Sequence, residues 1–234
     1  MRLGSSECQR GHVQPFVLWR SLNVTLDMDR KQELLDHTLT SSTCEACGTS
    51  ASVVYPLLYH DMGQKLMIWL WPEPGDPDYG NSRQFRIMKG YRFRIVRTIN
   101  ELVEKILVFD ENCDDREVEI FKFLLRGQRE NDSDPLDGTL YFLGIQRGED
   151  GDDILGFEHV PESGSESFGL PMSVYRDAVA SFRRDIRLEE PKRGTWLRVD
   201  AGFVQALVTR ASQQPTDPNN ETGDPAGDDV DELF

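Results

Sequence analysis

The hydrophobic pattern at the start of the chain predicts an extended segment followed by a helix. The apolar residues of 16–24 favour an extended conformation. A helix is predicted over Met28–Leu35, because Asp27 is a suitable N-cap and Leu34 and Leu35 supply a buried side.

Two further apolar runs predict strands that pair with each other. The first run, 51–59, is rich in Val, Leu and Tyr, and the second spans 65–71. Pro56 weakens the first run, because proline cannot donate a hydrogen bond to a ladder and prefers an edge strand. We expect these runs to belong to a small antiparallel sheet within residues 6–72.

The middle of the chain predicts a linker and two consecutive helices. Residues 72–81 are rich in proline and glycine and interrupt the pattern. Thr98 and Glu101 form a capping box in front of apolar residues at helical spacing, and Asp114 or Asp115 begins the second helix. Because the join between the helices is short, an antiparallel helical hairpin is expected.

The last part of the chain predicts a small α+β unit and a tail. Strands are expected at 138–146 and 154–160, a helix at 173–184, and a strand with a short helix within 196–207. Residues 211–234 contain few apolar residues and many Pro, Gly and acidic ones, so we expect disorder there.

Charge is distributed unevenly along the 234 residues. The formal net charge is −15, yet residues 130–166 hold eleven acids against one base, and residues 211–234 hold seven acids and no base. These two segments outweigh the net charge of the whole chain, so the remainder is close to neutral. Such a chain is not expected to attract nucleic acid or an anionic membrane in bulk.

The hydropathy profile and the N-terminus predict a cytoplasmic protein. No window reaches the roughly 18 apolar residues of a membrane span, and residues 1–10 lack the apolar core of a signal peptide. Cysteines in a reducing compartment remain thiols, which favours metal binding over disulfides.

Three of the four cysteines lie in two short clusters that predict the halves of one zinc site. The clusters span residues 8–12 and 44–48, and the second contains a Cys-x2-Cys-Gly turn, which directs two thiolates at one metal. Tetrahedral zinc needs four donors, of which the cysteines supply three and a histidine of the first cluster the fourth. The expected ligands of one structural zinc ion are Cys8, His12, Cys44 and Cys47.

Several motifs in the first 125 residues carry a family resemblance. Besides the two cysteine clusters, they lie at residues 19–24, 55–61, 67–69, 91–97 and 100–106. With these motifs the chain resembles the bacterial CpXC-domain family, named for its Cys-Pro-x-Cys cluster. The resemblance implies a zinc-ribbon-like domain and no established reaction.

The first cluster departs from the family pattern. Counted from Cys8, Gly11 occupies the position of the second cysteine, and glycine cannot ligate a metal. His12 is one residue later and can take over if the turn adjusts, with water or Glu7 as the alternative fourth ligand. An open fourth position would suit a metal-dependent hydrolase, which is disfavoured because three thiolates make zinc a weak Lewis acid.

Residues 83–97 hold the main concentration of bases, with aromatic residues between them and no acid. This composition is typical of a groove for single-stranded nucleic acid, which gives the alternative function. The competing interpretation is an extended segment with Phe93 and Ile95 inward and with Arg92 and Arg94 outward, paired with acids of the same chain. The candidate nucleic-acid contacts are Arg83, Arg86, Lys89, Tyr91, Arg92 and Arg94.

An acidic run ending in Leu233 and Phe234 closes the chain. It resembles the C-terminal tip of bacterial single-stranded-DNA-binding proteins, which docks partners through a terminal Phe, although that tip has proline where Leu233 stands. A terminal aromatic can fill an apolar pocket while upstream acids steer the encounter. The alternative is a tail that serves only solubility.

Together these patterns predict an α+β protein with a zinc-ribbon-like antiparallel sheet, a helical hairpin and a small C-terminal α+β part. The expected segments are 1–75, 76–130, 131–210 and the tail 211–234. The leading functional hypothesis is a non-enzymatic binding or adaptor protein with a structural zinc ion and a partner-docking tip at Leu233 and Phe234.

Overall fold

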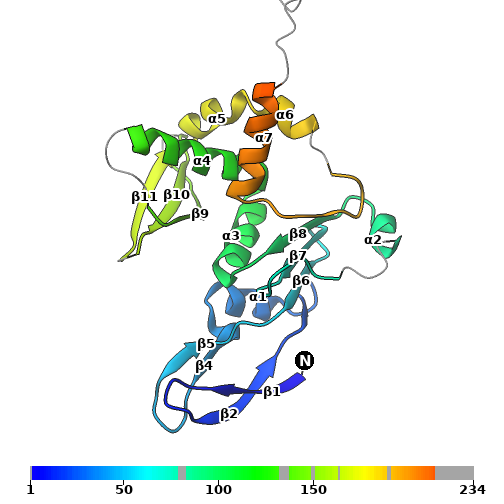
Figure 1. The fold of residues 1–234 in the computed structure, drawn as a ribbon, viewed down its shortest axis with the longest axis vertical. Helices are drawn as coiled ribbons and strands as arrows, with labels where there is room; N and C mark the ends of the chain where they lie inside the picture. Colours follow the sequence, from blue (N-terminus) through cyan, green and yellow to red (C-terminus); the bar gives the residue numbers. More distant parts are fainter. Residues whose placement is uncertain are drawn as a thin grey trace, which may run out of the picture.

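The computed structural model describes residues 2–78, 83–131, 137–148, 151–162, 164–188 and 191–213. It arranges them in three tiers along the longest axis (Figure 1). Two β-hairpins form the lower tier, a five-stranded sheet with helix α3 forms the middle tier, and a three-stranded sheet with the remaining long helices forms the upper tier. None of the helices in these ranges has the length and apolar character needed to cross a membrane.

The lower tier consists of two separate antiparallel hairpins. Strands β1 (Arg2–Glu7) and β2 (Val13–Leu18) form the first, and β4 (Ser41–Thr43) and β5 (Ser50–Ser52) form the second. Apart from Phe16, the described side chains of these strands are exposed or half-buried, and none belongs to either hydrophobic core cluster of the described residues. The contacts that hold the hairpins are therefore mainly polar, such as the hydrogen bond between the hydroxyls of Ser6 and Ser42 at 3.0 Å, with the Phe16 ring packed on Tyr55.

The middle tier is a mixed sheet in the order β12-β8-β7-β6-β3. Strands β6 (Leu57–Asp61) and β7 (Leu66–Leu70) pair antiparallel, whereas β3 (Ser21–Asn23), β8 (Arg92–Val96) and β12 (Trp196–Leu197) join in parallel. The prediction of one antiparallel sheet within the first 72 residues is therefore wrong. The two apolar runs contribute β6 and β7 to a sheet that also contains β8 and β12, which come from later in the chain.

Two predicted strands are interrupted where the chain passes from a hairpin to the central sheet. The extended segment 16–24 divides into β2 and β3, and the run 51–59 divides into β5 and β6 just before β6 starts, at Pro56, which has no N–H to donate. Helix α1 (Met28–Leu35) has the predicted bounds, but the Asp27 side chain makes no capping hydrogen bond. A short 3-10 turn, η1 (Thr38–Thr40), leads from α1 to β4.

Helices α3 (Ile99–Asp110) and α4 (Asp115–Asn131) follow each other directly, as predicted. The capping box is present in part, because the Thr98 hydroxyl accepts from the Glu101 N–H at 3.1 Å, while the Glu101 carboxylate accepts from the N–H of Arg97. In Figure 1, α4 runs across the end of α3 instead of back along it, so the closely antiparallel hairpin is not formed.

The upper tier contains the antiparallel sheet β11-β10-β9, helix α4 and three later helices. Strands β9 (Thr139–Gln146) and β10 (Ile154–Val160) match the prediction, but β11 (Glu166–Pro171) was not expected. The helix predicted over 173–184 is two helices, α5 (Met172–Ala180) and α6 (Arg183–Leu188). Helix α7 (Ala201–Gln213) continues past residue 211, so the tail begins later than predicted, and residues 214–234 lie outside the described ranges.

A chain of buried ion pairs lies between the central sheet and the upper tier. It alternates in sign, with N–O distances of 2.7, 3.4, 3.7, 2.6 and 2.7 Å. The order of its members is Arg94, Asp115, Lys105, Glu119, Lys122 and Glu104. Glu104 also accepts from the N–H of Phe142 in β9 at 2.8 Å. Three bases balance three acids, and the chain links β8 to β9 through α3 and α4.

Candidate metal centre

The turns that close the two lower hairpins bring the predicted ligands together. Each turn contains a glycine in the left-handed conformation, with a φ of 81° at Gly11 and 70° at Gly48. The Gly11 N–H donates to the carbonyl of Cys8 at 2.8 Å, and the Gly48 N–H donates to the carbonyl of Cys44 at 2.8 Å. Glycine is suited to both positions because it has no Cβ penalty at such a φ.

The two turns differ in length by one residue. The Cys8 N–H pairs with the carbonyl of His12 at 3.0 Å, whereas the Cys44 N–H pairs with that of Thr49, one residue further on, at 2.9 Å. Gly11 and Cys47 each lie three residues after the first cysteine of their turn. In conformation and hydrogen bonding, however, Gly11 corresponds to Gly48, the glycine of the second turn. The first turn therefore has no counterpart of Cys47, and His12, the residue just before β2, offers the fourth donor.

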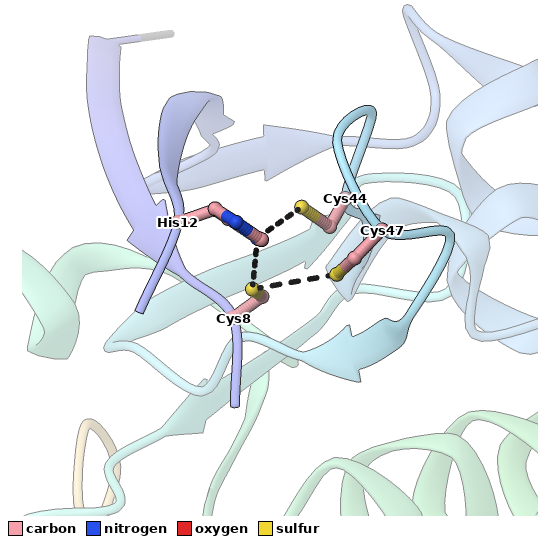
Figure 2. A group of neighbouring side chains, drawn as sticks. All are labelled: Cys8, His12, Cys44 and Cys47. Carbon is pink, nitrogen blue, oxygen red and sulfur yellow. Dashed lines mark hydrogen bonds between the residues drawn. The ribbon is translucent and has the colours of Figure 1, made fainter. Parts of the chain in front are cut away.

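Four donor atoms of these turns converge on one point, as Figure 2 shows. The sulfur of Cys8 lies 3.4 Å from Nδ1 of His12 and 3.7 Å from the sulfur of Cys47, and the same Nδ1 lies 3.6 Å from the sulfur of Cys44. All four donor atoms lie within 4.8 Å of one another. The four predicted residues could therefore hold one metal ion.

These distances fit the edges of a zinc tetrahedron. Zinc bonds of about 2.3 Å to sulfur and about 2.05 Å to nitrogen place two sulfurs about 3.8 Å apart, and sulfur and nitrogen about 3.6 Å apart. The side chains therefore need only small movements to close on a zinc-sized ion. Cys8 and Cys44 are 9% and 2% exposed, whereas His12 is exposed and forms the rim of the site.

Hydrogen bonds prepare part of the cluster for metal binding. Bonds from the side chain and backbone of Thr49, and then from His12, lower the pKa of Cys47 to about 6. Burial opposes ionisation of Cys8, but backbone hydrogen bonds within its own turn lower its pKa, while burial raises the pKa of Cys44. The neighbouring thiols of Cys47 and Cys8 raise the pKa of the His12 imidazole. A metal must therefore displace protons from this cluster.

Two supporting residues of the centre were not singled out by the sequence pattern. The Gln14 amide donates to the hydroxyl of Ser42 at 2.6 Å and to the carbonyl of Thr43 at 3.0 Å, and its oxygen accepts from the N–H of Glu45 at 3.0 Å. It thereby ties the first hairpin to the second turn. The second supporting residue is Thr49, whose hydroxyl oxygen lies 3.4 Å from the sulfur of Cys47. A lone glutamine in a strand and a threonine after a turn carry no distinctive signal.

The fourth cysteine lies apart from this cluster. Burial, followed by the charge of Glu111, raises the pKa of Cys113 to about 11. A thiol with such a pKa stays protonated near neutral pH and is a poor nucleophile. It serves as a reference cysteine for the experiments below.

The basic segment does not form one continuous surface. Arg83 opens helix α2 (Arg83–Ile87), Arg86 and Lys89 are exposed, and Tyr91 and Arg92 are half-buried. Arg94 is 4% exposed and held by Asp115, so the interpretation that placed it outward is wrong for this residue. The geometry takes Arg94 out of any nucleic-acid contact. The other predicted docking residues, Leu233 and Phe234, lie outside the described ranges.

Comparisons with known proteins agree with the cysteine motifs. No curated protein and no solved structure matches the chain significantly. The family model described as CpXC protein matches residues 7–122, a stretch that contains both cysteine-containing turns, the central β6–β8 strands and helix α3. The protein is therefore a CpXC-domain protein, with the domain within residues 7–122.

Proposed function

We propose that this protein is a non-enzymatic binding module whose two N-terminal hairpins are joined by one structural zinc ion. The observation that carries the proposal is the convergence of three thiols and one imidazole, whose donor atoms all lie within 4.8 Å of one another. Zinc is favoured among metals because sulfur-rich tetrahedral sets suit it. Thiolate ligands also suit a reducing compartment, so a cytoplasmic location is part of the proposal.

A structural role is favoured over a catalytic one by the completeness of the ligand set. Structural zinc sites are closed by four protein ligands, whereas catalytic sites keep a position for water or substrate. Here Cys8, His12, Cys44 and Cys47 would together fill all four positions. The metal would then join two hairpins that contribute nothing to either core cluster of the described residues.

Metal content and local stability test this proposal. Protein purified without chelator should contain one zinc ion per chain, and Cys47→Ser should weaken zinc binding by at least about tenfold, since even outer-shell partners contribute that much. Cys113→Ser is the matched control and should bind zinc normally. Zinc removal should speed amide exchange in residues 2–18 and 41–52 but not in β6 and β7.

Two results would contradict the presence of this zinc site. The first is a protein that purifies without metal and binds no zinc when it is added. The second is equal zinc affinity in Cys47→Ser and Cys113→Ser. Unchanged amide exchange of the two hairpins on zinc removal would leave a metal site but would refute its structural role.

The adaptor part of the proposal rests on the sequence of the C-terminal tip. A protein partner would be held by Leu233 and Phe234, with the preceding acids steering the encounter. Phe234→Ala should lose a partner that Val230→Ala, in the same acidic segment, retains. Equal recovery of partners by both variants in a pull-down would reduce the tail to a solubilising role.

A further inference from the structure

A cavity of about 490 Å³ lies beside β8, away from the metal centre. Its wall comes from three separate parts of the chain: residues 90–94, residues 109–116 at the turn between α3 and α4, and residues 191–195 before β12. In Figure 1 the last of these is the orange stretch that runs alongside β8. The volume is within the range of small-molecule sites, about 300–1,000 Å³.

The cavity wall is basic although the protein is strongly acidic. Its lining contains five bases and only two acids, an excess of three positive charges in a chain of net charge −15. The bases are Arg92, Arg94, Arg116, Lys192 and Arg193, and the acids are Asp114 and Asp115. A concave surface of one charge sign concentrates ligands of the opposite sign.

Two of these bases already have carboxylate partners. Asp115 accepts two hydrogen bonds from Arg94, at 2.7 and 2.8 Å, and Asp114 accepts from Arg116 at 2.7 Å. The remaining cations are therefore the ones that can meet a ligand. They are Arg92, Lys192 and Arg193, for which the described residues offer no carboxylate within ion-pair distance.

Arg92 is the most informative of the three. Its guanidinium is half-buried, lies over the ring of Phe109 at 4.2 Å, and has one long polar contact of 3.5 Å with the carbonyl of Gln64. Burial, and then the neighbouring charge of Arg94, lower its pKa. The Phe109 ring stabilises the cation from one face, but no carboxylate of the described residues lies within ion-pair distance of it.

The opposite wall of the cavity is held in place. Gly194 has a φ of 79°, and a Cβ there would lie 2.8 Å from the backbone nitrogen of Arg86, so the loop packs directly on α2. The Thr195 N–H donates to the carbonyl of Lys192 at 3.0 Å. Trp196 then packs against Phe85 and Phe93, with ring centroids 5.4 and 5.1 Å apart. The exposed Lys192 and Arg193 are thus presented at a fixed rim.

We propose that this cavity binds a small organic anion with two or more phosphate groups, of nucleoside-diphosphate size, through Arg92, Lys192 and Arg193. Guanidinium groups match phosphate oxygens in pairs, and a lysine adds a point charge. A nucleic-acid strand fits less well, because Arg94 and Arg116 are already paired with carboxylates.

The zinc-loaded full-length protein provides the test, with inorganic pyrophosphate as the probe. Isothermal titration at about 50 mM salt, where surface charges are moderately screened, should show saturable binding. The double variant Lys192→Gln/Arg193→Gln should weaken it by about tenfold or more. The control Arg20→Gln/Arg176→Gln removes the same charge from exposed sites elsewhere and should change the affinity by less than about twofold. Arg92→Gln, checked for an unchanged melting temperature, should also weaken binding by about tenfold.

Several outcomes would overturn the proposal. They are no saturable binding of pyrophosphate, equal losses in the cavity variant and in the control, or equal affinity for citrate, which would leave no preference for phosphate. A synthetic peptide of residues 228–234 that displaces pyrophosphate and binds more tightly would reassign the cavity to the chain's own acidic segment.

Discussion

Asp115 is the acid on which two members of the buried ion-pair chain depend, so Asp115→Asn tests that chain directly. Its side chain is 0% exposed, receives two hydrogen bonds from Arg94, and lies 3.4 Å from the amine of Lys105. Asparagine keeps the shape but removes the charge, so two buried cations lose a neutralising partner. Breaking a buried pair in this way costs about 3–5 kcal/mol, and we expect a loss of that size in the free energy of unfolding.

The neighbouring variant Asp114→Asn is the matched control. The Asp114 side chain is 33% exposed and pairs with Arg116 at 2.7 Å. Its oxygen also accepts from the Arg116 N–H at 2.9 Å, a bond that asparagine can replace. A pair that is only half-buried contributes less than a fully buried one, on the order of 1 kcal/mol. Urea unfolding of the zinc-loaded proteins, followed by circular dichroism, compares the two variants. If Asp115→Asn loses no more stability than Asp114→Asn, the buried chain does not hold the tiers together.

The same carboxylate should make the protein sensitive to acid. Burial opposes ionisation of Asp115, but the charges of Arg94 and Lys105 outweigh it and hold its pKa well below the usual value. A lowered pKa contributes stability that is present above the unfolded-state value of about 3.9 and is lost as the pH falls toward the folded-state value. Asp115→Asn should therefore lose less stability than the wild type below about pH 4. Equal slopes of stability against pH in that range would refute this.

Four further predictions concern the metal centre and the basic segment. Zinc affinity, measured by chelator competition, should fall from about pH 7.5 to about pH 5.5, because protons compete for the thiolates and for His12; a rise would contradict the assigned ligands. Gly48→Ala should weaken zinc binding by about fivefold, because a φ of 70° costs an alanine about 1 kcal/mol. Nothing lies within 4 Å of the added Cβ, so a steric clash does not contribute. Unchanged affinity would show that this φ is not required. His12→Cys should bind zinc more weakly than the wild type, because a cysteine side chain is shorter than a histidine side chain. A variant with a cysteine inserted between Arg10 and Gly11 should bind zinc tightly, because the insertion gives the first turn the length of the second. If His12→Cys binds zinc more tightly than the insertion variant, the comparison of the two turns is refuted. Wild-type protein should show no measurable binding to single-stranded DNA at low salt, and Arg86→Glu/Lys89→Glu should change nothing; saturable binding lost in that variant would restore the nucleic-acid alternative.

The sequence predicted the elements whose signals are local. Helix α1 has the predicted bounds, and the Thr98 cap begins α3 where expected. Strands β9 and β10 were also found, because alternation and turn residues mark them. Strand β11 was missed because Gly169 and Pro171 give it a weak pattern, and its conformation is set by pairing with β10.

Features that join distant segments could not be predicted in the same way. Arg94 belongs to an alternating segment and was expected outward, but Asp115, 21 positions later, pairs with it in the interior. The parallel pairing of β12 with β8 joins residues about a hundred positions apart. The cavity rim depends on that pairing, so Lys192 and Arg193 carried no signal of a site.

The change of ligand at the metal centre follows from the length of the first turn. With its left-handed glycine one residue earlier than in the second turn, the first turn has no position left for a second cysteine, and His12 is the next residue that faces the other thiols. Because the histidine side chain is longer than a cysteine side chain, it can reach the other donor atoms from this later position. The exchange also changes the charge: zinc with three thiolates and a neutral imidazole carries about −1, against about −2 with four thiolates. In a protein of net charge −15, the shorter turn would therefore keep a closed ligand set while placing less negative charge between two hairpins that contribute nothing to either core cluster of the described residues.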